Sequence, residues 1–144
     1  MILGAIVVSG CVNSPINQTN SNETAITGHF ENQYIKFELP DGISAKETSN
    51  DTSFDIILYK NGADIGEISS TNMPPQALDA LEGNNTTFAG KKAILSNDDF
   101  GSLLYIKIRN DSNGNNIGIR IELDPGYQNE FEYIKNSFVI KKSL

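Results

Sequence analysis

The fold of this chain is decided by two stretches, Leu103-Leu104-Tyr105-Ile106-Lys107-Ile108-Arg109 and Ile117-Gly118-Ile119-Arg120-Ile121-Glu122-Leu123. In each stretch apolar side chains recur at every second position, which is the pattern of a β-strand buried on one face. Residues 111–116, between the two stretches, are rich in Asp, Asn and Gly and are typical of a turn. We therefore expect a long antiparallel pair of strands with its apolar residues turned toward the core.

Further strands are expected on both sides of this pair. Ile35, Phe37 and Leu39 alternate with polar residues and predict a strand that ends at a turn in residues 40–42. After a polar loop, residues 54–60 and 63–70 predict a hairpin joined by Asn61-Gly62. Residues 86–95 predict another strand, interrupted at Gly90.

Two helices complete the predicted order of elements. Pro74-Pro75 is expected to open a short helix that ends at Gly83, and Asp124-Pro125 to open a second one. The second helix carries an apolar stripe, Tyr127, Phe131, Ile134 and Phe138, before a short edge strand at residues 139–140. The order strands, helix, strands, helix predicts an α+β fold, in which an antiparallel β-sheet has helices packed on it as an α-β-α sandwich.

The N-terminal residues indicate where the protein is located. An apolar run ends in Val8-Ser9-Gly10-Cys11, and Cys11 is the only cysteine. Small residues before a lone cysteine resemble the cleavage and lipidation site of an exported lipoprotein. The basic region that begins a signal peptide is missing, and its absence suggests that the start of the sequence is truncated. The alternative is that residues 2–8 form a buried strand and Cys11 is a core thiol. The polar residues that follow read as a flexible tether. We expect a partial lipoprotein signal peptide at 1–10, a lipidated Cys11 and tether at 11–27, and one folded domain at 28–144.

Three sequence features together resemble the PsbP-like domain, which is named for an extrinsic subunit of photosystem II. They are the pattern Phe-x-Asn-x-Tyr-Ile-x-Phe-x-x-Pro at residues 30–40, Thr87-Phe88-Ala89-Gly90-Lys91, and the closing Ile134-Lys135-Asn136-Ser137-Phe138. Within this family, the chain most resembles the small PsbP-related lipoproteins of methanogenic archaea. Family members often have Gly-Trp after the first Pro, whereas this chain has Asp41-Gly42-Ile43 and no Trp. The resemblance implies a PsbP-like fold and a non-enzymatic, surface-associated role, without the docking residues for a photosystem.

Composition argues against several classes of function. The net charge of −7 is unfavourable for binding nucleic acid, because phosphates attract basic patches. A single histidine, His29, leaves no second imidazole for a metal site or a catalytic base, and no thiol remains if Cys11 is lipidated. We expect a binding or assembly module without a cofactor, held at the extracytoplasmic face of the cell membrane by its lipid, with a protein or envelope partner. A hydrolase is the least favoured alternative.

Candidate site residues fall into three groups. Asp98, Asp99 and Asp111 are weak candidates for a calcium-binding loop, which would make the chain a solute- or ion-binding lipoprotein instead. Possible glycosylation sites are Asn17, Asn22, Asn50, Asn84, the overlapping Asn85, and Asn110. Polar residues of the long strand pair form a possible binding surface, unless both faces of the sheet are covered and Tyr105 is simply packed. These residues are Tyr105, Lys107, Arg109, Arg120 and Glu122.

Overall fold

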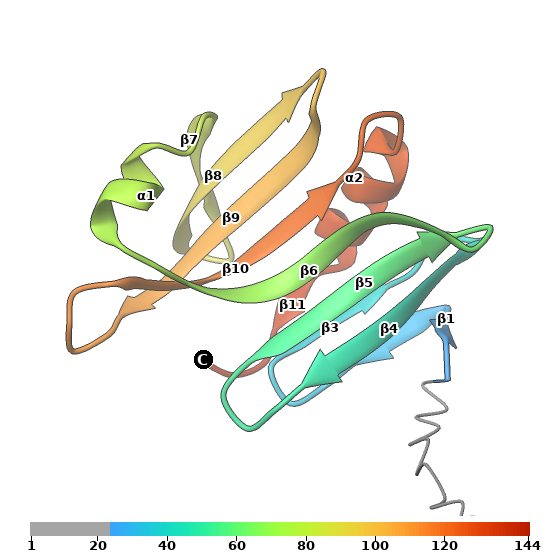
Figure 1. Cartoon of the computed structure of the whole chain (residues 1–144), viewed down its shortest axis with the longest axis horizontal. Coiled ribbons are helices and arrows are strands. Elements are labelled where there is room, and N and C mark those ends of the chain that lie inside the picture. Colours follow the sequence, from blue (N-terminus) through green and yellow to red (C-terminus); the bar gives the residue numbers. More distant parts are fainter. Residues whose placement is uncertain (1–23) are drawn as a thin grey trace, which may run out of the picture.

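The computed structural model describes residues 24–144 and contains the expected central pair as β9 (Gly101–Asn110) and β10 (Asn116–Leu123) (Figure 1). The two strands are antiparallel, and Leu104 lies opposite Ile121 with both side chains buried. The apolar alternation of the sequence is therefore confirmed as the buried face of this pair.

Nine further strands and two helices surround the pair in the described part of the chain. The large sheet also contains β1 (Ile26–Thr27), β4 (Ile43–Ser49), β5 (Phe54–Lys60), β6 (Ala63–Met73), β7 (Asn84–Phe88) and β8 (Lys91–Asp98). Its eight strands are ordered β1-β4-β5-β6-β10-β9-β8-β7, with antiparallel neighbours throughout. A three-stranded sheet contains β11 (Val139–Ile140), β3 (Ile35–Glu38) and β2 (His29–Glu31) in that order. The helices are α1 (Pro75–Asp79) and α2 (Gln128–Ser137).

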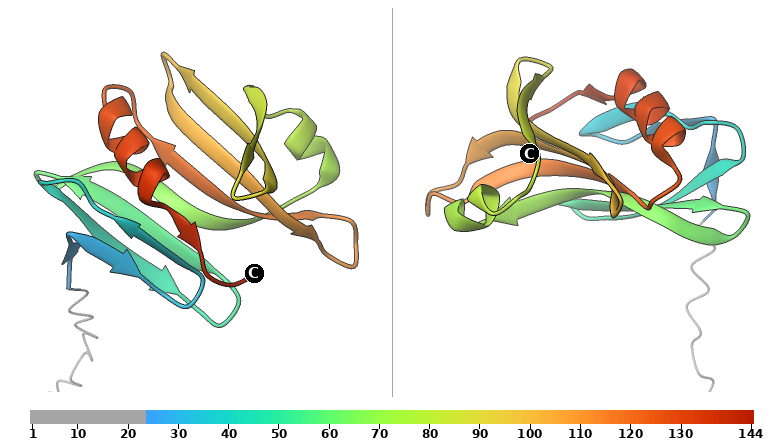
Figure 2. Two further views of the ribbon diagram at one scale, coloured as in Figure 1. Left: turned by 180° about the vertical axis from the view of Figure 1, so that it is seen from behind. Right: turned by 90° about the horizontal axis from the view of Figure 1, so that it is seen from above.

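The two helices lie on opposite faces of the large sheet (Figure 2). Helix α2 and the small sheet cover one face, here called the inner face, and enclose the hydrophobic core. Phe131 and Ile134 of α2 are fully buried there, and Phe138 stacks on Phe37 of β3 with ring centroids 5.8 Å apart. The face that carries α1 is called the outer face. Burial of each large apolar side chain contributes about 1.5–3 kcal/mol, so the inner layer supplies most of the stability.

The expected α+β fold, an antiparallel sheet with packed helices in an α-β-α sandwich of PsbP-like type, is wrong. Strands make up 55% of the structure and helices 12%. Helix α1 has five residues, none of them buried, so it is not a packed layer. On the inner face α2 shares its layer with the small sheet. The result is a mainly β architecture built on an eight-stranded antiparallel sheet.

The missing strands explain this error. Residues 43–49, expected as part of a polar loop, form β4, in which only Ile43 and Ala45 are buried. Residues 84–98 form two strands, β7 and β8, because Ala89 and Gly90 adopt positive φ angles of 49° and 74° and close a tight hairpin. Both β4 and β7 lie near the margins of the sheet and are stabilised mainly by backbone hydrogen bonds, so their side chains carry little hydrophobic pattern.

The N-terminal expectations fall largely outside the described residues. The signal peptide at 1–10, Cys11 and the tether up to residue 23 are not covered by the structure. The described chain joins the large sheet at β1, where Ile26 pairs with Ala45, two residues before the expected domain boundary. Among residues 24–144 there is no helix of the length and apolarity needed to cross a bilayer.

Candidate functional site

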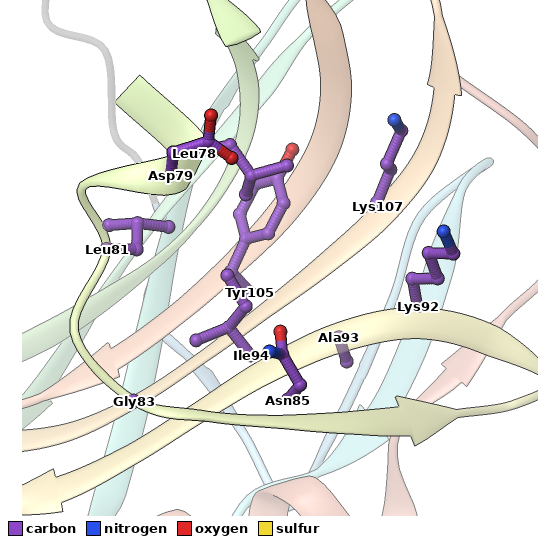
Figure 3. Close-up of a pocket in the computed structure, with 10 residues that line it drawn as sticks. All are labelled: Leu78, Asp79, Leu81, Gly83, Asn85, Lys92, Ala93, Ile94, Tyr105 and Lys107. Atoms are coloured by element: carbon purple, nitrogen blue, oxygen red, sulfur yellow. The ribbon is translucent and has the colours of Figure 1, made fainter. Parts of the chain in front are cut away.

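A cavity of about 320 Å³ lies on the outer face beneath α1, and we call it the α1 pocket. One side is formed by α1 and the loop after it, and the other by β7, β8 and β9 (Figure 3). The helix side contributes Leu78, Asp79, Leu81 and Gly83. The strand side contributes Asn85, Lys92, Ala93, Ile94, Tyr105 and Lys107.

Local sequence places α1 over these strands. Pro75 stands at the start of the helix, where an amide donor is not needed. Gly83, which has a φ of 150°, ends the connection close to β8: a Cβ at this position would lie 2.8 Å from the carbonyl oxygen of Leu95. The chain between Asp79 and β7 is therefore short and held against the sheet, which leaves a half-open cavity under the helix.

Tyr105 forms the wall of the pocket next to α1. Its side chain is 1% exposed although it lies outside the main hydrophobic cluster. The ring crosses the neighbouring strand over Gly118, where a Cβ would lie 2.5 Å from the phenol oxygen. The absence of a side chain at Gly118 thus creates the space in which the ring lies, and the ring in turn covers the exposed backbone of β10. The alternative in which Tyr105 is packed, rather than displayed on an open face, is the one the structure supports.

The Tyr105 hydroxyl is buried without a well-aligned hydrogen-bond partner among the described residues. The Thr71 hydroxyl is likewise buried without a well-aligned hydrogen-bond partner among the described residues. Burial raises the pKa of the Tyr105 phenol, and the neighbouring Thr71 hydroxyl partly opposes this increase. Buried polar groups are almost always paired, because an unpaired one costs about 1–3 kcal/mol. The two hydroxyls therefore form a buried polar pair behind the pocket wall without a well-aligned hydrogen bond.

The other polar residues of the strand pair do not gather at the pocket, apart from Lys107. Arg120 pairs with Glu122 on the same strand and lies 3.9 Å from Glu67 on β6. Arg109 donates from Nε to the carbonyl oxygen of Leu144 at 2.7 Å. The predicted polar surface is thus divided into an ion-paired part on β6 and β10 and the pocket over β8 and β9.

The candidate calcium ligands are far apart. Asp98 and Asp99 precede β9 and Asp111 follows it, and a ten-residue strand is about 30 Å long. Asp111 organises its own turn: its Oδ1 accepts hydrogen bonds from the amides of Asn113 and Asn115 at 2.8 and 2.9 Å. Within residues 24–144 no group of three or more His, Cys, Asp or Glu side chains is placed to hold a metal ion.

His29 is held by two carboxylates on the small sheet, away from the α1 pocket. Its Nδ1 lies 2.8 Å from Glu38 and its Nε2 lies 3.3 Å from Glu31. Hydrogen bonds that the imidazole donates to the carboxylates of Glu38 and, to a smaller extent, Glu31 raise its pKa above 6.5. The imidazole is thereby favoured in its charged form, which is a poor general base.

The glycosylation candidates differ in their surroundings. The Nδ2 of Asn110, the atom that a glycan would modify, donates to the carbonyl oxygen of Gly114 at 2.9 Å within the turn. Asn50 uses its Oδ1 instead, as an acceptor from the amides of Thr52 and Ser53. Asn84 and Asn85 are exposed on the edge strand β7, and Asn85 also lines the α1 pocket. Asn17 and Asn22 lie outside the described residues.

Sequence reasoning missed the helix side of the pocket and the contribution of β8. Leu78 and Leu81, within the short helix expected from Pro74-Pro75 to Gly83, are only partly buried and border the cavity. Lys92 and Ile94 were part of an interrupted strand without a partner. Reading residues 84–98 as a hairpin through Ala89-Gly90 places Lys92 and Ile94 beside β9, and is the signal that would have found them.

Comparison of the chain with protein-family models, with curated proteins and with solved structures finds no match.

Proposed function

We propose that this chain is a non-enzymatic binding module that holds a protein or envelope partner at the α1 pocket. In this proposal the lipid on Cys11 attaches the module to the extracytoplasmic face of the cell membrane. The resemblance to PsbP-related lipoproteins is in keeping with such a role and is part of the proposal.

The observation that carries the proposal is the incomplete burial of α1 and of the loop after it. A five-residue helix is too short to be stable alone, and its burial pattern contains no buried residue. Leu78 of α1 and Leu81 of the loop after it are only partly buried and border the cavity instead of closing onto the sheet. A segment that served stability alone would bury these two leucines. Their incomplete burial beside a preformed cavity favours a contact with another molecule.

The chemistry of the pocket also favours binding over catalysis. The lining residues include no histidine, cysteine, serine or threonine, so the described pocket has no nucleophile–base pair of the usual type. His29, the only imidazole, is occupied by Glu38 and Glu31. Tyr105 has a raised pKa and stays protonated near neutral pH.

Site-specific photocrosslinking on the full chain tests the proposal. A benzophenone amino acid in place of Asn85 lies at the rim of the pocket, and the same amino acid in place of Thr48 lies exposed on β4, across the sheet. In membranes of the producing cells we expect a discrete crosslinked species from position 85 and none from position 48. Equal products from both positions, or none from position 85, would refute binding at the pocket.

The anchor is tested separately by incorporation of a labelled lipid. We expect labelling and recovery with membranes for the parent chain, and loss of both for Cys11→Ser. An unlabelled parent chain found away from the membrane would show that the anchor is wrong, without bearing on the pocket.

A further inference from the structure

We propose that the α1 pocket binds the C-terminal residue of a peptide chain, with the terminal carboxylate at Lys92 and Lys107 and an apolar side chain against α1. This inference rests on the proposed function and specifies the chemical group that the pocket recognises.

Two unpaired lysines supply the first argument. The register of β8 and β9 pairs Ala93 with Ile106, and Lys92 and Lys107 each lie one residue beyond this pair on the two neighbouring strands. Both line the pocket, and neither forms an ion pair with any described residue. Like charges close together on neighbouring strands repel, so an isolated pair is unfavourable. In a chain of net charge −7, two adjacent cations without a carboxylate partner favour a bound anion.

The opposite side of the pocket has the opposite charge. Asp79 is its only acidic lining residue and comes from α1, whereas the ammonium groups project from β8 and β9 (Figure 3). A chain end matches both sides, because its carboxylate is anionic and the amide N–H of the same residue is a donor for the Asp79 carboxylate. A simple organic acid offers only the first of these groups.

The apolar lining residues determine which type of C-terminal residue the pocket accommodates. Leu78, Leu81 and Ile94 are partly buried and line the cavity, and the ring of Tyr105 forms one wall. The volume of about 320 Å³ lies at the lower end of the range for small-ligand sites. It accommodates one terminal residue with a branched aliphatic side chain such as leucine.

The test uses the full chain and three probes in ¹H–¹⁵N correlation spectra. N-acetyl-leucine mimics the chain end, N-acetylleucinamide lacks the charge, and 4-methylpentanoate has the carboxylate and side chain but no N–H. We expect N-acetyl-leucine to shift the amide signals of Lys92, Lys107 and Leu81, and to bind about tenfold more tightly than the amide. Equal binding of acid and amide would overturn the proposal. Binding of 4-methylpentanoate as tight as that of N-acetyl-leucine would overturn the assignment to a peptide end.

Variants locate the contact. The double change Lys92→Gln and Lys107→Gln is expected to abolish the preference for the acid over the amide. Lys91→Gln is the matched control, because Lys91 is the next residue of β8 and does not line the pocket. Unchanged selectivity in the double variant would refute the role of the two lysines. Crosslinking at Asn85 without any carboxylate preference would leave the proposed function standing and remove only this inference.

Discussion

The contact between Tyr105 and Gly118 allows a quantitative prediction for Gly118→Ala. The added Cβ would lie 2.5 Å from the phenol oxygen and 2.7 Å from the carbonyl oxygen of Ile106, against 3.4–4 Å for ordinary contact. Overpacking of this kind costs about 2–3 kcal/mol where backbone must also move. Alanine is otherwise favoured over glycine in a strand by about 0.5–1 kcal/mol. We expect Gly118→Ala to lower the free energy of unfolding by about 1–2.5 kcal/mol.

A double-mutant cycle isolates the phenol. Tyr105→Phe removes the atom nearest to the added Cβ and also a buried hydroxyl without a well-aligned partner, so alone it is expected to leave stability unchanged or to raise it by up to about 1 kcal/mol. In the Tyr105→Phe background, the cost of Gly118→Ala is expected to fall by about 1 kcal/mol. The contacts of the added Cβ with the ring carbon Cζ, at 2.6 Å, and with the carbonyl oxygen of Ile106 remain, so the rescue is partial.

Equilibrium urea unfolding followed by far-UV circular dichroism measures all four variants of the cycle. A constant slope against urea is needed, so that midpoint shifts report stability alone. The same cost of Gly118→Ala in both backgrounds would show that the phenol oxygen does not contribute to the clash at Gly118.

Three further predictions concern other contacts. Glu130→Gln is expected to lower stability by about 1 kcal/mol at pH 7, because Glu130 Oε1 lies 2.6 Å from Lys60 Nζ. Since Lys60 lowers the pKa of Glu130, the difference in stability between the parent chain and the variant is present above the ordinary pKa of 4.5. The difference is lost as the pH falls through the lowered pKa, which urea unfolding at several pH values checks. Glu38→Gln is expected to bring the pKa of His29 back toward 6.5, which NMR titration of the single imidazole measures. Any stabilisation by this pair is present below pH 6.5 and is lost as the pH rises through the raised pKa. An unchanged titration would contradict the contact. Asp111→Ala is expected to lower the midpoint of thermal unfolding, with Asp111→Asn lowering it less because the Oδ1 acceptor is kept; equal losses would contradict the role of this acceptor.

The strands with strong alternation could be predicted from the sequence, because burial of one face imposes a period of two on the side chains. This is why residues 103–109 and 117–123 were placed correctly. The apolar stripe of α2 was also correct, since Phe131 and Ile134 are both fully buried. The helix begins at Gln128, a few residues after the expected start, because the first residues after Asp124 form a turn.

The pocket could not be predicted in the same way. Its strand side depends on β7, whose first four residues are exposed and carry no hydrophobic period. It also depends on a hairpin that requires a positive φ at Ala89, a residue that rarely adopts one. Its helix side depends on Leu78 and Leu81 remaining half-buried, whereas their spacing suggests full burial. That Lys92 and Lys107 lie on neighbouring strands of one pocket follows only once the register of β8 and β9 is known.

The strand order also fixes how far the pocket lies from the point where the described chain enters the fold. The chain enters at β1, one margin of the large sheet, and the pocket lies over β8 and β9 near the other margin. Five to six interstrand spacings of about 4.8 Å separate them, which gives about 24–29 Å across the sheet. Because hydrogen-bonded strands keep this distance constant, the sheet holds β1 and the pocket at a fixed separation. A partner bound at the pocket is therefore held about this distance from the point where the described chain enters the sheet.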